Sequence, residues 1–152
     1  MSTIKARAAG ANQRSPGTDD RSSDWGRLLL RVSLGALILL HGIAKVVAGP
    51  GFIVGMLAKA GLPSVIAYGV YVGEVVAPLL LIAGLWTRAA AAVVVVNMVV
   101  AVLLVHAGEL HKLTQTGGWA LELQGLYLVA ALAVALLGAG RYSVGGSYSR
   151  WN

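Results

Sequence analysis

The feature that most limits how this chain folds is an almost unbroken apolar run over residues 28–47. An α-helix rises about 1.5 Å per residue, so about twenty apolar residues cross the roughly 30 Å hydrocarbon core of a bilayer. Inside that core, only helices and closed barrels satisfy their own backbone hydrogen bonds. The run therefore predicts a first transmembrane helix, which we place at residues 25–47.

The composition extends this prediction to the whole chain. The 152 residues are 57% hydrophobic and only 12% charged, whereas soluble domains are about 45–50% apolar and about 25% charged. Three further apolar runs predict spans at residues 64–85, 88–106 and 119–138. We therefore predict an all-α, polytopic membrane protein whose four-helix transmembrane bundle fills residues 25–140. A chain of this length leaves no room for a separate catalytic domain.

The segments outside the spans are polar or short. Residues 1–24 carry no apolar periodicity and predict a disordered cytoplasmic tail. Residues 141–152 are rich in Gly and Ser and predict a second, exposed cytoplasmic tail. Residues 49–61 are too few to cross the bilayer, and predict an outer loop with a short interfacial helix. We expect Arg27 and Arg31 to extend their charges to the lipid headgroups.

The distribution of positive charge predicts the orientation. Of the twelve Lys and Arg residues, nine fall on the side of the two tails and three on the opposite side. The positive-inside rule then places both termini in the cytoplasm. The net charge of +6 gathers at the ends of apolar runs rather than along one basic helix, so we predict no nucleic-acid binding. The absence of cysteine excludes disulfides, thiol chemistry and cysteine-bound zinc or iron–sulfur clusters for this chain.

Ionisable residues within the predicted spans define a candidate site. His41 and Lys45 lie one turn apart near the outer end of the first span, and Glu74 lies near the middle of the second. Such groups are costly in a membrane unless they face partners or water, which makes them a functional hypothesis, and pairing with Glu74 is the economical solution. The predicted outward-opening polar pocket consists of His41, Gly42, Lys45, Glu74 and Glu122.

Other residues are expected to shape this region. Pro78 leaves the carbonyl group of Glu74 without its usual helical partner and predicts a kink. Gly69, Gly73 and Ala77 form a stripe of small residues that lets a neighbouring helix approach closely, and Asn97 is expected to bond between helices.

Simpler interpretations of the same residues stay open. His41 could bond only a backbone carbonyl, and Lys45 could only reach the headgroups. His106, Glu109 and His111 carry ligand chemistry for a metal, alone or with His41 or Glu122, but they form no recognised ligand motif, so no metal site is predicted.

Several motifs together resemble the DoxX family of small bacterial membrane proteins. They are R-x-x-x-G-x-x-x-L-L-H-G-x-x-K over residues 31–45, Glu74, G-L-W-T-R-A-A-A over residues 84–91, Glu122, and G-A-G-R-Y-S over residues 138–143. The residues that match the family pattern are His41, Gly42, Lys45, Glu74 and Arg88. The family usually continues with a hydrophobic residue and an Asp, whereas Val144 is followed here by Gly145.

The resemblance implies a four-helix protein of the bacterial inner membrane, related to subunits that accompany quinone-linked sulfur oxidation and other oxidoreductases. Two functions are left open, and no catalytic residue is assigned. In the first, the pocket binds a quinone, with His41 or Lys45 donating to a ring carbonyl and Glu74 relaying protons. In the second, the protein is a non-catalytic scaffold that recruits partner redox enzymes. Homo-oligomerisation within the lipid bilayer is compatible with both.

Overall fold

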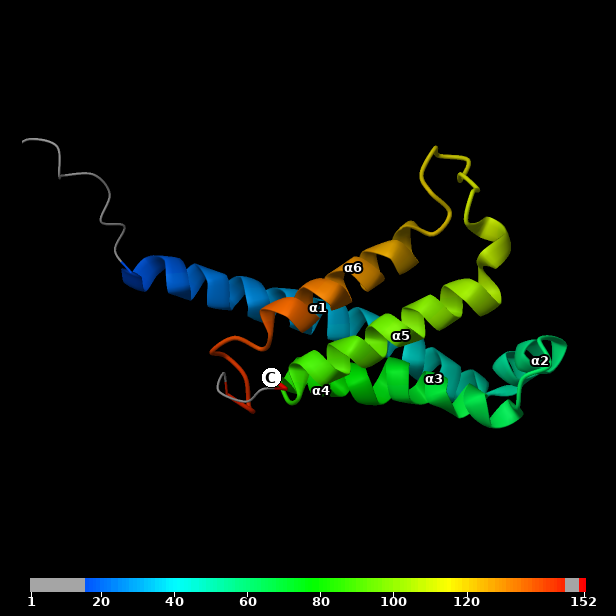
Figure 1. The fold of residues 1–152 in the computed structure, drawn as a ribbon, viewed down its shortest axis with the longest axis horizontal. Helices are drawn as coiled ribbons and strands as arrows, with labels where there is room; N and C mark the ends of the chain where they lie inside the picture. The colour runs from blue at the N-terminus through cyan, green and yellow to red at the C-terminus, as the bar shows by residue number, and fades with distance from the viewer. Residues whose placement is uncertain (1–15, 147–150) are drawn as a thin grey trace, which may run out of the picture.

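The computed structural model describes residues 16–146 and 151–152, and over these residues the chain is all-α (Figure 1). Three stretches are long and apolar enough to cross a membrane: Arg21–Ala48, Ser64–Ala83 and Thr87–Val105. A shorter apolar helix, Glu122–Leu137, packs with them. The prediction of an all-α, multi-pass membrane bundle is confirmed.

The first helix begins earlier than expected. α1 runs from Pro16 to Ala48, so residues 16–24 are helical and the prediction of a disordered segment is wrong for them. Proline is favoured in the first turn of a helix because its fixed φ is already helical and its missing N–H would have no partner there. The rest of the predicted tail, residues 1–15, lies outside the described residues.

The second span is a composite helix. Its consecutive parts are a 3₁₀ turn η1 (Ser64–Tyr68), α3 (Gly69–Tyr71), a π turn η2 (Val72–Val76) and α4 (Ala77–Ala83). The N–H of Ala77 donates to the carbonyl of Val72, the five-residue spacing of a π turn. Because Pro78 offers no N–H to the carbonyl of Glu74, the regular α-helical pattern cannot continue through this point. The irregular backbone therefore falls around Glu74, and π turns of this kind are frequent at functional sites.

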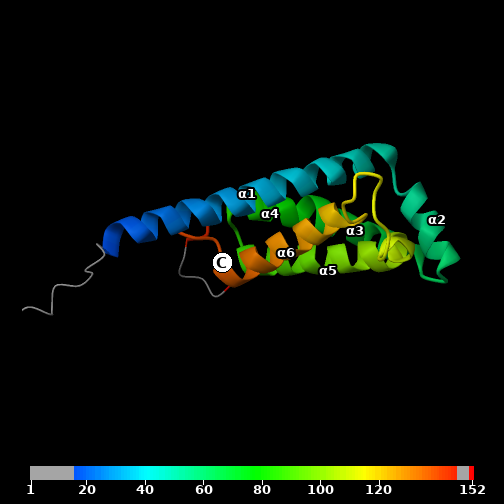
Figure 2. The same ribbon diagram turned by 90° about the horizontal axis from the view of Figure 1, so that it is seen from above.

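The segments that connect the long helices lie at the two ends of the bundle (Figures 1 and 2). At one end lie the short helix α2 (Gly51–Lys59) and the loop between α5 (Thr87–Val105) and α6 (Glu122–Leu137), which contains the 3₁₀ turn η3 (Ala107–Glu109). At the other end lie the turn from α4 to α5 and the segment after α6. The short helix expected within residues 49–61 is therefore present.

The core lies where α1, α4, α5 and α6 meet. α5 packs against both α6 and α4, and α1 packs against both α4 and α6. At Gly35 in α1, a Cβ atom would lie only 2.9 Å from the carbonyl oxygen of Pro78, so the two helices approach more closely than a larger residue allows. The buried side chains of this core are Leu34, Ile38, Ala77, Leu81, Ala90, Ala91, Val94, Met98, Ala131 and Val134.

Arg31 does not extend to the surface, so that prediction is wrong. Its side chain is 1% exposed, and its Nη1 donates to the carbonyls of Leu81 at 2.6 Å and Ile82 at 2.8 Å, while Nη2 donates to the carbonyl of Tyr142. The last carbonyls of a helix have no partner within the helix, and a guanidinium group satisfies them well. Arg31 thus joins α1 to the end of α4 and to the segment after α6.

The end of the described chain is also less exposed than predicted. Asn152 is 5% exposed, and its Oδ1 accepts hydrogen bonds from the backbone N–H and the hydroxyl of Thr87. The Nε of Arg88 donates to the backbone oxygen of Asn152 at 3.2 Å. The first N–H groups of α5 need acceptors from outside the helix, and Asn152 supplies one. The prediction of an exposed tail is therefore wrong at this residue.

Candidate polar site within the bundle

The site is centred on an ion pair between α1 and the π turn. Lys45 Nζ donates to Glu74 Oε1 at 2.5 Å, and Asn97 Nδ2 donates to the same oxygen at 3.3 Å. The Glu74 side chain is 5% exposed and that of Lys45 is 39% exposed. Glu74 Oε2 is buried and has no hydrogen-bond partner within the described part of the chain. One oxygen of the carboxylate, Oε1, therefore accepts two hydrogen bonds, and the other oxygen, Oε2, is a buried acceptor without a donor.

Two glycines allow three helices to meet at this carboxylate. A Cβ atom at Gly42 would overlap the carbonyl oxygen of Glu74, and a Cβ atom at Gly73 would overlap the Asn97 side chain. Gly42 thus brings α1 against the π turn, and Gly73 brings the π turn against α5. The expected role of Gly73 is confirmed, whereas Gly69 has no neighbour this close.

His41 lies beside the ion pair. Its Nδ1 is 2.9 Å from the carbonyl oxygen of Leu37 in its own helix, and its ring meets that of Tyr127 edge-on with centroids 5.9 Å apart. It lines the same cavity as Lys45 and Glu74. The bond to a backbone carbonyl is the simpler interpretation of His41 that the sequence left open.

A polar cavity of about 120 Å³ separates these groups from the end of α5 and the start of α6. Its polar lining consists of His41, Lys45, Glu74, His106, Gln124 and Tyr127. A second cavity of about 310 Å³ shares Lys45, Glu74 and His106 with the first and extends beneath α2. Together they reach the size range of small-molecule sites, about 300–1,000 Å³.

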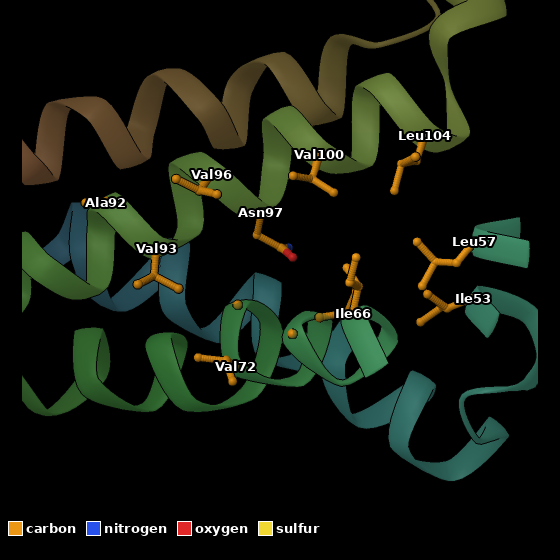
Figure 3. A pocket seen from close by; sticks show the side chains of 13 residues that line it. Ile53, Leu57, Ile66, Val72, Ala92, Val93, Val96, Asn97, Val100 and Leu104 are labelled. Atoms are coloured by element: carbon orange, nitrogen blue, oxygen red, sulfur yellow. The ribbon is translucent and has the colours of Figure 1, made fainter. Parts of the chain in front are cut away.

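An apolar groove of about 530 Å³ adjoins this polar region (Figure 3). It lies between the second span, α5 and α2, and Asn97 points into it from α5. The groove and the second cavity share six lining residues: Ile53, Leu57, Val70, Asn97, Val100 and Leu104. A buried carboxylate, a partly exposed ammonium group and an extended apolar surface therefore lie side by side.

The structure places Glu122 apart from the other predicted site residues. Its Oε1 accepts the backbone N–H of Trp119 at 3.0 Å, in the first turn of α6. Carboxylates are favourable in this position because the first N–H groups of a helix lack partners. Glu122 lines none of the three spaces described above, although the next two residues, Leu123 and Gln124, line the smaller cavity.

The sequence did not predict that His106 faces the cavity. His106 ends α5, with its Nδ1 2.7 Å from Glu109 Oε2 and its Nε2 3.3 Å from Gln124 Nε2. Its position directly after an apolar run was visible, but the direction of its ring depends on the loop and on α6. Among residues 16–146 and 151–152, no three His, Asp or Glu side chains cluster as a metal site requires.

The fold and its apolar helices define a helical, multi-pass membrane protein. Residues 26–107 match the DoxX family, and the chain belongs to that family. An uncharacterized protein from Haemophilus influenzae is 35% identical over 114 residues, which cover 73% of this chain and 81% of that protein. No solved structure was found to match. The family match includes His41, Gly42, Lys45, Glu74 and Arg88, while Glu122 lies beyond it.

Proposed function

We propose that this DoxX-family protein binds a quinone, or a similar lipid-soluble dicarbonyl carrier, as a membrane subunit or accessory of an oxidoreductase system. The observation that carries the proposal is the Lys45–Glu74 pair, which lines a cavity that adjoins an apolar groove. A quinone has the same two parts, a polar ring and an apolar tail.

The donors and acceptors suit both redox forms of such a ring. The carbonyl oxygens of the oxidised form accept hydrogen bonds, which Lys45, Asn97 or His41 can donate. The hydroxyl groups of the reduced form donate hydrogen bonds, which the carboxylate of Glu74 can accept. The site can therefore hold the carrier before and after reduction, which is what a redox subunit requires.

The apolar groove supports a carrier that arrives through the lipid. Its walls are aliphatic side chains such as Val93, Val96 and Val100, and Asn97 is its polar member. A water-soluble substrate gains little from such a surface, whereas a hydrocarbon tail is stabilised by burying its area there. The cysteine-free chain carries no thiol or cysteine-bound cluster, so in this proposal the electrons come from a partner enzyme.

The test is to purify the protein in mild detergent from quinone-containing membranes and to quantify the bound quinone by mass spectrometry. We expect near-stoichiometric quinone in the unmodified protein and at least a tenfold loss in Glu74→Gln. Glu122→Gln is the matched control, because it neutralises a carboxylate outside the cavities, and it should retain the quinone. A stoichiometric partner protein without quinone would instead support the scaffold function.

We also propose that the end bearing α2 faces away from the cytoplasm. The arginines Arg21, Arg27, Arg31, Arg88 and Arg141 belong to the opposite end of the bundle, while Lys45, Lys59 and Lys112 belong to the α2 end. This separation supports cytoplasmic termini by the positive-inside rule. The polar cavity then opens toward the outer side of the bacterial inner membrane.

A further inference from the structure

We propose that α2 is a lid over the second cavity, which opens to let a lipid-soluble ligand move its polar part from the apolar groove toward Lys45. Leu57 is the side chain that holds the lid closed. The inference rests on the proposed function, because it states how the ligand of that site enters from the lipid. The position of α2 can nevertheless be measured without any ligand.

α2 forms a wall that the groove and the second cavity share. Four α2 side chains, Phe52, Ile53, Met56 and Leu57, line the second cavity, and Ile53 and Leu57 also line the groove. Figure 3 shows Ile53 and Leu57 extending from α2 toward Leu104 of α5, which lines both spaces as well. A movement of α2 away from α5 therefore widens the passage between the two spaces.

The two spaces offer different surroundings to a ligand. The groove is bordered by side chains that are exposed on the outside of the bundle, such as Val72 at 48% and Val96 at 62%. The second cavity instead reaches Lys45 and His106. A ligand with an apolar tail and a polar ring therefore moves its ring past α2 to reach Lys45, while its tail stays in the groove.

α2 is attached to the rest of the bundle by few side chains. Leu57, which is 1% exposed, is its only buried residue. The only polar side chain of α2, that of Lys59, belongs to an exposed residue, so apolar contacts rather than side-chain hydrogen bonds hold α2 in place. Segments with few buried apolar contacts open at a lower free energy than the core of a protein. α2 is therefore the element around the cavity that separates most easily.

The connections on both sides of α2 contain a glycine at positive φ. Gly49, with φ +78°, lies between α1 and α2, and Gly61, with φ +69°, lies between α2 and η1. Apart from chain neighbours, no atom lies within 4 Å of the Cβ position of either glycine. Glycine adopts positive and negative φ with similar ease. The angle of α2 can therefore change while α1 and the second span stay in place.

The experiment measures the position of α2 by pulsed electron paramagnetic resonance, on the purified full chain in lipid nanodiscs after bound quinone has been removed. The chain has no cysteine, so spin labels attach only at Ala58→Cys in α2 and Leu126→Cys in α6. Both positions are exposed and line none of the three spaces. We expect two distances between the labels, one for the closed position of the structure and one for the open position.

Variants in the doubly labelled chain test whether Leu57 holds the lid closed. Leu57→Ala should raise the share of the open distance at least twofold. Leu104→Ala should act in the same direction from the opposite wall, so it tests the lid even if Leu57→Ala fails to fold. Gly55→Ala is the matched control, because Gly55 lies in α2 with no atom near its Cβ position, and it should leave the share unchanged.

The lid is overturned by a single distance that is the same in the labelled chain, in Leu57→Ala and in Leu104→Ala, or by equal shares in all three variants. These outcomes are separate from quinone binding. A protein that copurifies with quinone but has one position of α2 contradicts only the lid. Two positions of α2 in a protein that never retains quinone support the lid and contradict only the proposed ligand.

Discussion

At the scale of single residues, the molecule is organised by what surrounds Glu74. Its carboxylate receives one charged donor and one amide donor on the same oxygen, while Gly42 packs against its backbone. A buried carboxylate without such donors would be costly in a membrane. Lys45 and Asn97 therefore stabilise the charge, and Gly42 makes the geometry possible.

The first prediction concerns the coupling of Lys45 and Glu74. Breaking a buried ion pair costs roughly 3–5 kcal/mol, whereas removing both charges can be nearly neutral. Because Lys45 is 39% exposed, we expect each loss toward or below the lower end of that range. Glu74→Gln and Lys45→Met should each lower thermal stability in detergent, and the double variant should recover part of the loss.

A double-mutant cycle measured by thermal unfolding checks this coupling. Lys59→Met is the matched control, because it removes an exposed ammonium group from α2 and should leave stability unchanged. Effects of the two single variants that simply add would show that the pair is not coupled.

The second prediction concerns Gly42. In Gly42→Ala the new methyl group overlaps the carbonyl oxygen of Glu74, so the backbone of α1 or of the π turn must move. Overpacking of this kind costs about 1–3 kcal/mol. We expect a lower midpoint of thermal unfolding and a weaker Lys45–Glu74 contact.

Gly26→Ala is the control for Gly42→Ala, because Gly26 lies in the same helix with no atom near its Cβ position. Alanine is favoured over glycine in a helix by roughly 0.5–1 kcal/mol. The two substitutions should therefore change stability in opposite directions, and equal effects would contradict the close approach at Gly42.

At the scale of elements, the helices are held together at their ends by backbone groups that need partners. Arg31 from α1 satisfies the carbonyls of Leu81 and Ile82 near the end of α4. Asn152 satisfies N–H and hydroxyl groups at the start of α5. Both contacts lie at the end of the bundle opposite α2. Hydrogen bonds therefore join the helices at this end, while the α2 end contains the cavities.

The third prediction tests this fastening. Arg31→Lys keeps the charge but loses the planar fork that reaches two elements at once. Each buried carbonyl left without a donor costs about 1–3 kcal/mol. We expect thermal stability to fall clearly in Arg31→Lys but not in Arg27→Lys, since Arg27 makes a partly exposed contact to Asp24 at 3.5 Å. Equal stability of the two variants would show that the contacts of Arg31 with the end of α4 do not stabilise the bundle.

At the scale of the whole molecule, the bundle has two chemically different ends. The described arginines belong to the end with the turn from α4 to α5, and Lys45, Lys59, α2 and the two cavities lined by Lys45 and Glu74 belong to the other. By the positive-inside rule, this asymmetry supports the proposed topology with cytoplasmic termini.

The fourth prediction gives that orientation a direct measurement. Single cysteines at Lys59, Lys112 and Arg141, each introduced into the cysteine-free chain, are exposed positions outside the apolar spans. An impermeant thiol reagent applied to intact cells should label Lys59→Cys and Lys112→Cys and should label Arg141→Cys only after lysis. The reverse pattern would invert the proposed topology and turn the cavity toward the cytoplasm.

The sequence by itself determined the number and approximate limits of the apolar helices, because the length of an apolar run and the thickness of a bilayer are local quantities. It also indicated that Glu74 pairs with Lys45 or His41, since an ionisable residue in an apolar span requires a partner. The sequence did not predict that α1 begins at Pro16, because the polar composition of residues 16–24 indicated no packing partner.

Only the tertiary structure decided the remaining contacts. Arg31 binds Leu81, Ile82 and Tyr142, which are far along the chain, and such pairing leaves no local signal. The orientation of the His106 ring depends on its contacts with Glu109 and Gln124. The Glu122 side chain accepts a hydrogen bond from the backbone N–H of Trp119, just before α6, and does not line the cavity. Polar side chains bind whichever unsatisfied group the packing of helices brings near, and that group is known only once the helices are assembled.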